Sequence, residues 1–199
     1  MKIEVTERQY EIIEAAGKIL TEKGVGGLTI KNLSAQMNFT ESAVYRHFRS
    51  KEDIIAAMLN FLCENIEIRF DTIMLQYTEP EEKLKAAINS QFDFFSKNPH
   101  FVVAVFSDGL LEESEKINNI ILKIMSFKSK FITDIIKDGQ AKMVFNEKIS
   151  SEKLVHIVMG SFRLFMFKWR LDNFKFDLQT EGSDMMNSVI SLIRKCNEK

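Results

Sequence analysis

Three helix-start signals follow one another in the short segment 29–51, and this spacing constrains the fold more than any other feature. Thr29, Thr40 and Ser50 are of the residue types that cap helix N-termini, and each precedes an apolar pattern of helical period. Ser50 with Asp53 three residues later has the spacing of a capping box, with Asp in place of the usual Glu. The segment therefore predicts two short helices and the start of a third.

The first two of these helices are joined by a very short connection. Asn38 accepts a left-handed backbone conformation more easily than most residues, so it can turn the chain sharply before Phe39. A helix, a tight turn and a second helix form the motif that places its second helix in the DNA major groove, which makes residues 41–47 the reading element. Hydroxyl, imidazole and cationic donors that suit a phosphate surface gather in and just after it: Tyr45, Arg46, His47, Arg49 and Lys51.

This part of the chain resembles the TetR/AcrR family of bacterial transcriptional regulators. Many positions between Arg8 and Leu59 agree with the family in order and spacing, including Ala43-Val44-Tyr45, His47-Phe48 and Ser50-Lys51-Glu52. The family commonly has glycine where this chain has Asn38, and both residues tolerate the left-handed turn. The resemblance implies an all-α fold. An N-terminal three-helix helix-turn-helix DNA-binding domain, 1–50, would precede a larger C-terminal helical ligand-binding and dimerisation domain, 51–199.

The resemblance also implies the DNA-binding residues. They are Thr29, Thr40, Glu41, Ser42, Ala43, Tyr45, Arg46, His47 and Lys51. Tyr45, His47 and Lys51 are expected at phosphates, whereas residues 41–43 and Arg46 face base edges or the groove wall. Two roles stay open for Arg46, because it can form a bidentate contact to guanine or hold a phosphate. His47 has an alternative role as a metal ligand or catalytic base, but no ligand cluster is visible around the three histidines of the chain.

Charge argues against nucleic acid at first sight. The chain of 199 residues has a net charge of −1, and in residues 1–55 eight acids balance eight basic residues. DNA binding must therefore rest on local placement, because four of those acids precede Lys18 whereas the segment 46–51 is locally basic.

Cys63 and Cys196 have no metal-type or redox-type spacing, so buried thiols are favoured over a disulfide. The acidic N-terminus indicates no signal peptide, which predicts a cytoplasmic protein with no membrane partner.

Two prolines and eight glycines leave long stretches free to be helical. Apolar periodicity predicts helices over these ranges: 6–23, 51–77, 79–97, 100–108, 112–142, 151–172 and 183–195. The range 151–172 is apolar on nearly every side, so it must be covered on every side. We therefore expect a homodimer formed through the last two helices, Ser151 to Asp172 and Ser183 to Lys195, as the resemblance also implies.

A regulator of this kind needs a cavity for a small apolar or amphipathic effector, and Met and Phe line adaptable cavities. Fifteen of the 17 phenylalanines lie beyond Lys51, where most of them are expected in the core. The candidate ligand-binding residues are Phe92, Phe101, Phe106, Phe127, Phe131, Met159, Phe162 and Arg163. If Arg163 is buried, an acid must pair with it (Asp108, Glu112 or Glu113), unless it lies at a solvated dimer rim. Alternatively it binds the anionic head of a fatty acyl ligand.

The function that these patterns favour is a ligand-responsive transcriptional regulator. It would bind a palindromic double-stranded DNA operator as a dimer, act as a repressor, and be released by its effector. A dimeric sensor or adaptor without DNA binding is the alternative, kept open by the neutral N-terminal domain. An all-helical enzyme is disfavoured, because no paired carboxylates, activated nucleophile, phosphate-binding loop or metal set is visible. No cofactor and no metal are expected.

Overall fold

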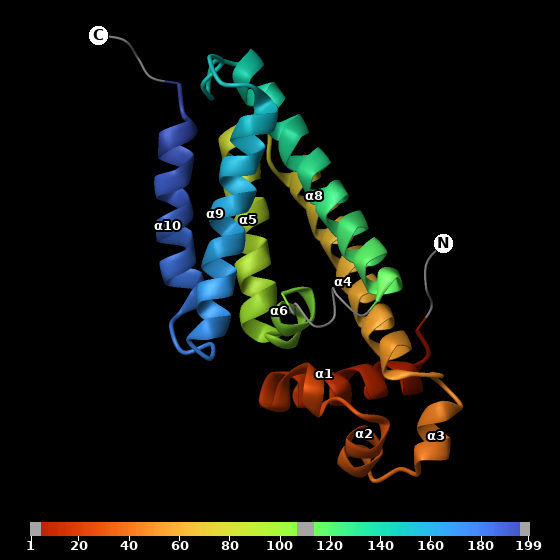
Figure 1. The fold of residues 1–199 in the computed structure, drawn as a ribbon. Coiled ribbons are helices and arrows are strands. Elements are labelled where there is room, and N and C mark those ends of the chain that lie inside the picture. Colours follow the sequence, from red (N-terminus) through yellow and green to blue (C-terminus); the bar gives the residue numbers. More distant parts are fainter. Residues whose placement is uncertain (1–4, 107–113, 196–199) are drawn as a thin grey trace. The chain divides into compact units, whose positions relative to one another are not determined.

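The computed structural model describes residues 5–106 and 114–195. Within these ranges the chain is helical (Figure 1), apart from turns and an isolated bridge between Phe145 and Arg194. The helices are α1 (Glu7–Gly27), α2 (Ile30–Met37), α3 (Glu41–Tyr45), α4 (Lys51–Gln76), α5 (Pro80–Lys97), α6 (His100–Val105), α8 (Glu115–Ala141), α9 (Ser151–Leu171) and α10 (Leu178–Ile193). The predicted all-α fold class is confirmed.

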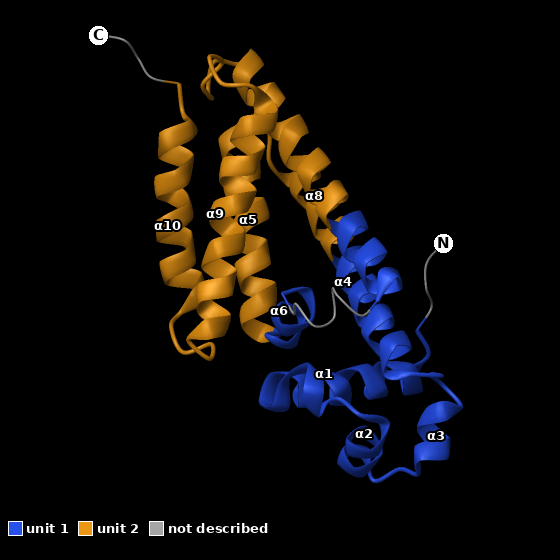
Figure 2. Ribbon diagram, viewed as in Figure 1, with its two compact units in different colours: residues 1–65, 98–124 blue, residues 66–97, 125–199 orange. Residues whose placement is uncertain are grey.

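Two compact units make up the fold (Figure 2). The first unit contains residues 1–65 and 98–124, and the second contains residues 66–97 and 125–199. Two of the three limits between these units fall inside α4 and α8, and none of them tests the domain boundary predicted between residues 50 and 51. That boundary stays a prediction.

The helix-turn-helix of the first unit forms as its caps predict. The Thr29 side chain accepts a hydrogen bond from the Asn32 backbone N–H at 3.1 Å, and Thr40 accepts one from the Ala43 N–H at 3.2 Å. Asn38 ends α2 in the left-handed conformation, with φ 54° and ψ 40°. α2 packs against both α1 and α3, where apolar side chains such as Val44 are fully buried. The N-terminal caps and the left-handed turn are therefore confirmed.

α1 also packs against α6 within the first unit. The contact is close at Gly17, where an added Cβ would lie 2.9 Å from Cγ of His100. His100 is buried, and its Nε2 atom has no hydrogen-bond partner among the described residues. Burial lowers the pKa of His100 to about 4, because desolvation disfavours the charged imidazolium. The α1–α6 contact thus requires a glycine and a neutral histidine.

In the second unit, α10 packs against α5 and α9. α10 begins at Leu178, whereas the sequence pattern placed its start at Ser183, because the Asp177 side chain caps it through the N–H groups of Gln179 and Thr180. Gly182 therefore lies inside the helix. An added Cβ there would lie 2.8 Å from Cζ of Phe92, so the glycine allows α5 to pack closely against α10.

α9 is not covered on every side by its own chain, and the expectation that a second copy covers the remaining side stays a prediction. One face is buried, for example at Met166 and Trp169, but Leu164 and Leu171 are 69% and 67% exposed. Ile157 and Phe167 are exposed as well, as is Leu192 on α10.

Across residues 5–106 and 114–195, no helix combines the length and apolar character that a membrane span requires.

Candidate nucleic-acid interface and effector site

α3 presents a polar face and buries an apolar one. Val44 is fully buried and Phe48 nearly so, which fixes the helix on the first unit. The side chains of Glu41, Ser42, Arg46 and His47 are exposed, and Tyr45 is 50% exposed. This follows from helical spacing, because the residues that alternate with the apolar ridge point away from the core. The structure thus brings most of the predicted DNA-binding residues onto one short exposed element.

The remaining predicted residues flank that element. Thr29 and Thr40 are exposed and use their hydroxyl oxygens as caps, and Thr40 Oγ1 lies 3.0 Å from Ser42 Oγ. Ala43 is half-buried, and Lys51 begins α4. A capping hydroxyl still has its own proton to donate, so Thr29 keeps a donor suited to a phosphate oxygen. In the pair of Thr40 and Ser42, either hydroxyl can be the donor to the other.

Ion pairs change the local charge around Lys51. The Asp53 carboxylate binds Lys116 Nζ at 2.5 Å, and the hydrogen bond to Lys116 lowers the pKa of Asp53. Glu52 accepts a hydrogen bond from the Ser114 hydroxyl. The two acids that follow Lys51 therefore interact with residues at the start of α8. This leaves the segment from Arg46 to Lys51 locally basic.

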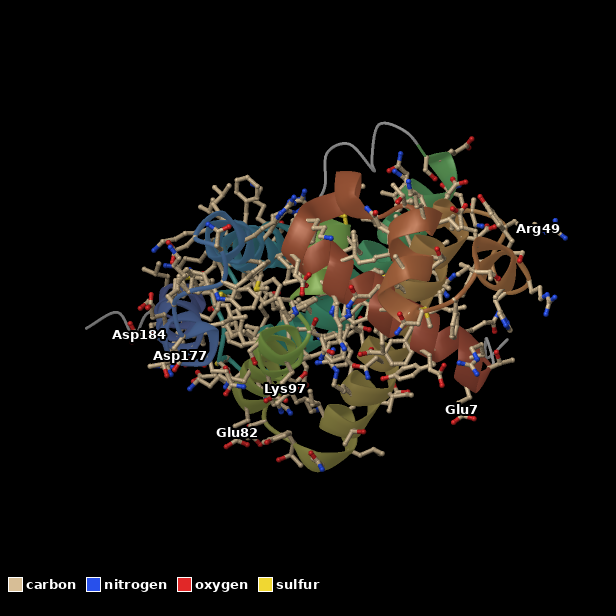
Figure 3. All side chains as sticks on the ribbon, turned by 90° about the horizontal axis from the view of Figure 1, so that it is seen from below. Glu7, Arg49, Glu82, Lys97, Asp177 and Asp184 are labelled. Carbon is tan, nitrogen blue, oxygen red and sulfur yellow. The ribbon has the colours of Figure 1, made fainter. Side chains whose placement is uncertain are left out.

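Gln9 lay outside the predicted set, whereas Arg49 was already among the cations expected to suit phosphate. Gln9 Nε2 donates a hydrogen bond to the His47 carbonyl at 3.5 Å, and the same residue completes a capping box with Thr6 at the start of α1. The Thr-x-x-Gln spacing is a sequence signal for that box. Arg49 is exposed, and Figure 3 shows its side chain extending away from the ribbon. Arg49 therefore adds a cation to the surface next to α3.

The candidate effector residues fall into separate groups. In the second unit, Phe92 stacks on Phe162 at a centroid distance of 5.2 Å. Phe127 and Phe131 both contact Phe70, at 6.0 and 4.2 Å between ring centroids. Met159 is half-buried on α9. These residues form the aromatic interior of the second unit.

Phe101 and Phe106 belong to the first unit. Phe101 is buried on α6, stacks on Phe61 at 6.2 Å and lies 4.3 Å from the His100 ring. Phe106 follows α6 and is half-buried. A single site shared by all eight candidate residues therefore stays a prediction.

Arg163 lies exposed on α9. An acid partner was expected for Arg163 only if its side chain was buried. Because water can solvate an exposed guanidinium, that requirement does not apply. The proposed acid partners Asp108, Glu112 and Glu113 lie outside the described residues, as does Cys196. Cys63 is buried on α4.

Two other cations of the second unit are half-buried, and sequence reasoning missed both. Burial lowers the pKa of Lys128 to about 8, with the nearby positive charge of Arg69 as a further cause. Burial also lowers the pKa of Arg69 to about 10, while the Asp93 carboxylate acts in the opposite direction. Among the described residues, no cluster of three or more His, Cys, Asp or Glu side chains could hold a metal ion.

Comparison with known proteins identifies relatives along most of the chain. Residues 12–58 match the profile of bacterial regulatory proteins of the tetR family, and residues 58–194 match that of the YsiA-like protein C-terminal region. The nucleoid occlusion factor SlmA of Aliivibrio fischeri is 28% identical over 165 residues, which is 80% of this chain and 84% of SlmA.

Two solved structures have the same fold. The ketosteroid transcriptional regulator KstR2 of Mycobacterium tuberculosis superimposes with a TM-score of 0.81 at 18% identity, covering 97% of this chain and 98% of KstR2. The transcriptional regulator FadR of Bacillus subtilis, solved in complex with stearoyl-CoA, has a TM-score of 0.76 at 19% identity, covering 94% of this chain and 97% of FadR. With both profiles matched in order and a helix-turn-helix at the N-terminus, the chain belongs to the TetR family of bacterial transcriptional regulators.

Proposed function

We propose that this protein is a repressor that binds a palindromic DNA operator as a homodimer and is released by a small apolar or amphipathic effector. The observation that carries the proposal is the exposed polar face of α3, held on the first unit by buried Val44 and Phe48. Repression is chosen because it is the commoner outcome in the family.

The DNA-binding part is supported by the chemistry of that face. Tyr45, His47 and Lys51 supply donors for phosphate oxygens, and Arg46 supplies a planar guanidinium for a guanine or a phosphate. Since Asp53 is paired with Lys116, its charge does not oppose the phosphates strongly. A dimer presents this surface twice, so weak contacts add up over two half-sites.

Dimerisation is supported by the apolar residues that α9 and α10 leave uncovered. They are Ile157, Leu164, Phe167 and Leu171 on α9, and Leu192 on α10. A run of exposed apolar side chains along one helix is typical of an interface between protein chains. The two last helices of a second copy would cover the same residues by symmetry.

Release by an apolar or amphipathic effector is supported by the aromatic interior of the second unit. Phenylalanine rings of α4 and α8 contact one another there, as do rings of α5 and α9, and rings can rotate to admit a flexible ligand. FadR of Bacillus subtilis, a structural neighbour, was solved in complex with stearoyl-CoA, an acyl thioester. A ligand that prefers the form unable to bind DNA would shift the population away from the operator.

The test is fluorescence anisotropy with labelled DNA from upstream of the protein's own reading frame, at about 50 and 200 mM salt, where phosphate contacts differ in strength. The key variant is the double substitution Tyr45→Ala/His47→Ala. The matched control is Tyr77→Ala/His156→Ala, which removes an exposed tyrosine and an exposed histidine of the second unit.

We expect tight, salt-dependent binding for the wild type and the control, and loss of binding for the α3 variant. Equal binding by all three proteins would refute the role of α3. A dimer of correct mass that binds no upstream DNA at either salt concentration would instead support the sensor or adaptor without DNA binding.

A further inference from the structure

α9 carries a regular stripe of residues along its exposed side. Exposed positions 157, 160, 164, 167 and 171 follow one another in alternating steps of three and four, which is the spacing of a coiled-coil seam. Four of these five positions are apolar side chains: Ile157, Leu164, Phe167 and Leu171. Buried residues of α9, such as Phe162 and Met166, lie on the opposite side of the helix. These five positions, named here the α9 seam, therefore form a second face that its own chain leaves exposed.

Gly160, the fifth position, lies in the middle of the α9 seam. At Gly17, Gly139 and Gly182, which also lie inside helices, an added Cβ would lie less than 3.0 Å from another side chain. At Gly160 an added Cβ meets no atom within 4 Å among the described residues, and its backbone has no positive φ. Glycine inside a helix is destabilising relative to alanine. The fold of a single chain thus gives no reason for glycine at this position.

A glycine is required where two helix backbones approach each other closely. The distance between the axes of packed helices depends on the side chains at the point of contact. Without a side chain there, the backbones come closer, and apolar side chains on either side of the contact pack against the facing helix. Gly160 has Ile157 three residues before it and Leu164 four residues after it. This arrangement predicts that another helix crosses α9 at Gly160.

A second copy of α9 fits the α9 seam. A helix with steps of three and four packs best against a helix with the same steps, and an identical helix has them at the same positions. In a pair related by a two-fold axis through this point, Gly160 of each copy lies next to Gly160 of the other. Ile157 of each copy then lies opposite Leu164 of the other, so one contact is made twice.

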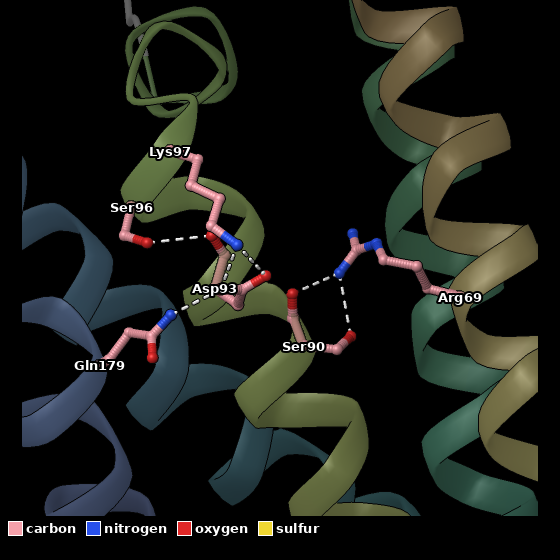
Figure 4. A network of polar contacts seen from close by, with 6 residues as sticks. All are labelled: Arg69, Ser90, Asp93, Ser96, Lys97 and Gln179. Carbon is pink, nitrogen blue, oxygen red and sulfur yellow. Dashed lines mark hydrogen bonds and ion pairs between the residues drawn. The ribbon is translucent and has the colours of Figure 1, made fainter. Parts of the chain in front are cut away.

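The helix next to α9 is held in place by its other side. Figure 4 shows Gln179 of α10 bonded to Asp93 of α5, and the distance between Nε2 and Oδ1 is 2.8 Å. Ser183, four residues later on α10, donates to Oδ1 of Asn89 at 2.9 Å. Since α10 also packs against α9, the two helices form one preformed layer. The exposed face of α10 lies opposite these contacts with α5.

The charges on this layer also favour a second copy as the partner. Lys153 and Lys168 are exposed on α9. α10 contains no lysine or arginine, and its exposed face has the acids Glu181 and Asp184. A second copy supplies the same two faces, so its acidic α10 can lie near the basic residues of α9, where unlike charges favour association.

We propose that the α9 helices of two copies cross at Gly160, and that this glycine sets the register of the homodimer. Ile157 of each copy packs against Leu164 of the other. The inference rests on the homodimer of the proposed function and assigns its point of closest contact.

Sedimentation velocity over a dilution series tests the crossing, with the wild type, Gly160→Ala and Gly160→Leu. Gly26→Leu is the matched control, because Gly26 is an exposed glycine of the first unit whose added Cβ also meets nothing within 4 Å. Helix propensity alone predicts that Gly160→Ala does not weaken the dimer. A close crossing predicts the opposite, because each added side chain separates the two helices.

We expect the dissociation constant of the dimer to rise by at least about tenfold in Gly160→Ala and further in Gly160→Leu, while Gly26→Leu matches the wild type. Circular dichroism checks that each variant keeps its helices. An unchanged dissociation constant in a folded Gly160→Leu protein would overturn the inference and leave the homodimer standing. A wild type that is monomeric at every concentration would instead refute the proposed homodimer, and the crossing with it.

Cross-linking gives a second test that needs no disruptive side chain. A disulfide forms only between cysteines whose Cα atoms lie about 4 to 7 Å apart. Under mild oxidation we expect Gly160→Cys to form a covalent dimer on a non-reducing gel, whereas Gly26→Cys and the wild type, with its own Cys63 and Cys196, do not. If the wild type is a dimer and Gly160→Cys forms no disulfide, the crossing at Gly160 is refuted, whatever the fold of the leucine variant.

Discussion

His100 links acid stability to the contact between α1 and α6, and substituting it with leucine tests that link. The imidazole is buried against Gly17, and its pKa is lowered to about 4 from an ordinary value of 6.5. Between these two values the unfolded chain binds a proton that the folded protein does not bind. The free energy of unfolding therefore falls as the pH decreases from 6.5, and the loss is complete below the folded pKa.

The size of the effect follows from the shift. A difference of roughly 2.5 pKa units at about 1.4 kcal/mol per unit corresponds to about 3 kcal/mol in total, of which about 2 kcal/mol is lost by pH 5. Such a loss is a large fraction of the stability of a typical domain. Replacing His100 with leucine, which has a similar volume and no titrating group, removes this contribution.

The measurement is urea unfolding followed by circular dichroism at pH 7, 6 and 5, for the wild type, His100→Leu and His156→Leu. His156 is an exposed histidine on α9, so its variant controls for the loss of a histidine as such. We expect the wild type and His156→Leu to lose about 2 kcal/mol more than His100→Leu between pH 7 and 5. Parallel losses in all three proteins would show that His100 is not buried as a neutral imidazole.

Three further substitutions test other parts of the fold. Gly182→Ala places a Cβ 2.8 Å from Cζ of Phe92 and is expected to lower the free energy of unfolding by about 1 to 3 kcal/mol, measured by thermal unfolding. The control Gly26→Ala, whose added Cβ meets nothing within 4 Å, is expected to lower it far less. Asn38→Ala forces alanine into a left-handed turn with φ 54° and is expected to lower the free energy of unfolding by about 1 kcal/mol, while Asn38→Gly remains close to the wild type. Equal losses of stability in both variants would exclude the turn as the cause. Lys51→Met removes one phosphate contact per protomer, so the slope of log K against log salt is expected to become shallower by about 2 in a dimer, and an unchanged slope would mean that Lys51 does not bind phosphate.

Local sequence signals predicted most of the first unit, because its structure is set by local chemistry. Threonine hydroxyls satisfy the free N–H groups of α2 and α3, and Asn38 allows the left-handed turn, irrespective of what packs around them. Long-range contacts decided the rest. The start of α10 was predicted too late because Gly182 reads as an interruption, whereas packing against Phe92 makes the glycine necessary within the helix.

Charge in the interior was the hardest feature to predict, and it shows which sequence signal deserves more weight. Arg163 was a candidate for the head group of a ligand, beside an acid partner or solvent, because it interrupts an apolar helix. Gly160 before it and Phe167 after it are exposed too, so that stripe faces solvent. Lys128 interrupts a stripe whose members one turn away on either side, Ile124 and Ile132, are both buried. A cation inside a regular apolar stripe of period 3.6 is thus a good guide to a buried charge, because the stripe identifies which face of the helix is buried. A cation on a helix that is apolar on all sides is a poorer guide, because no single face is identified.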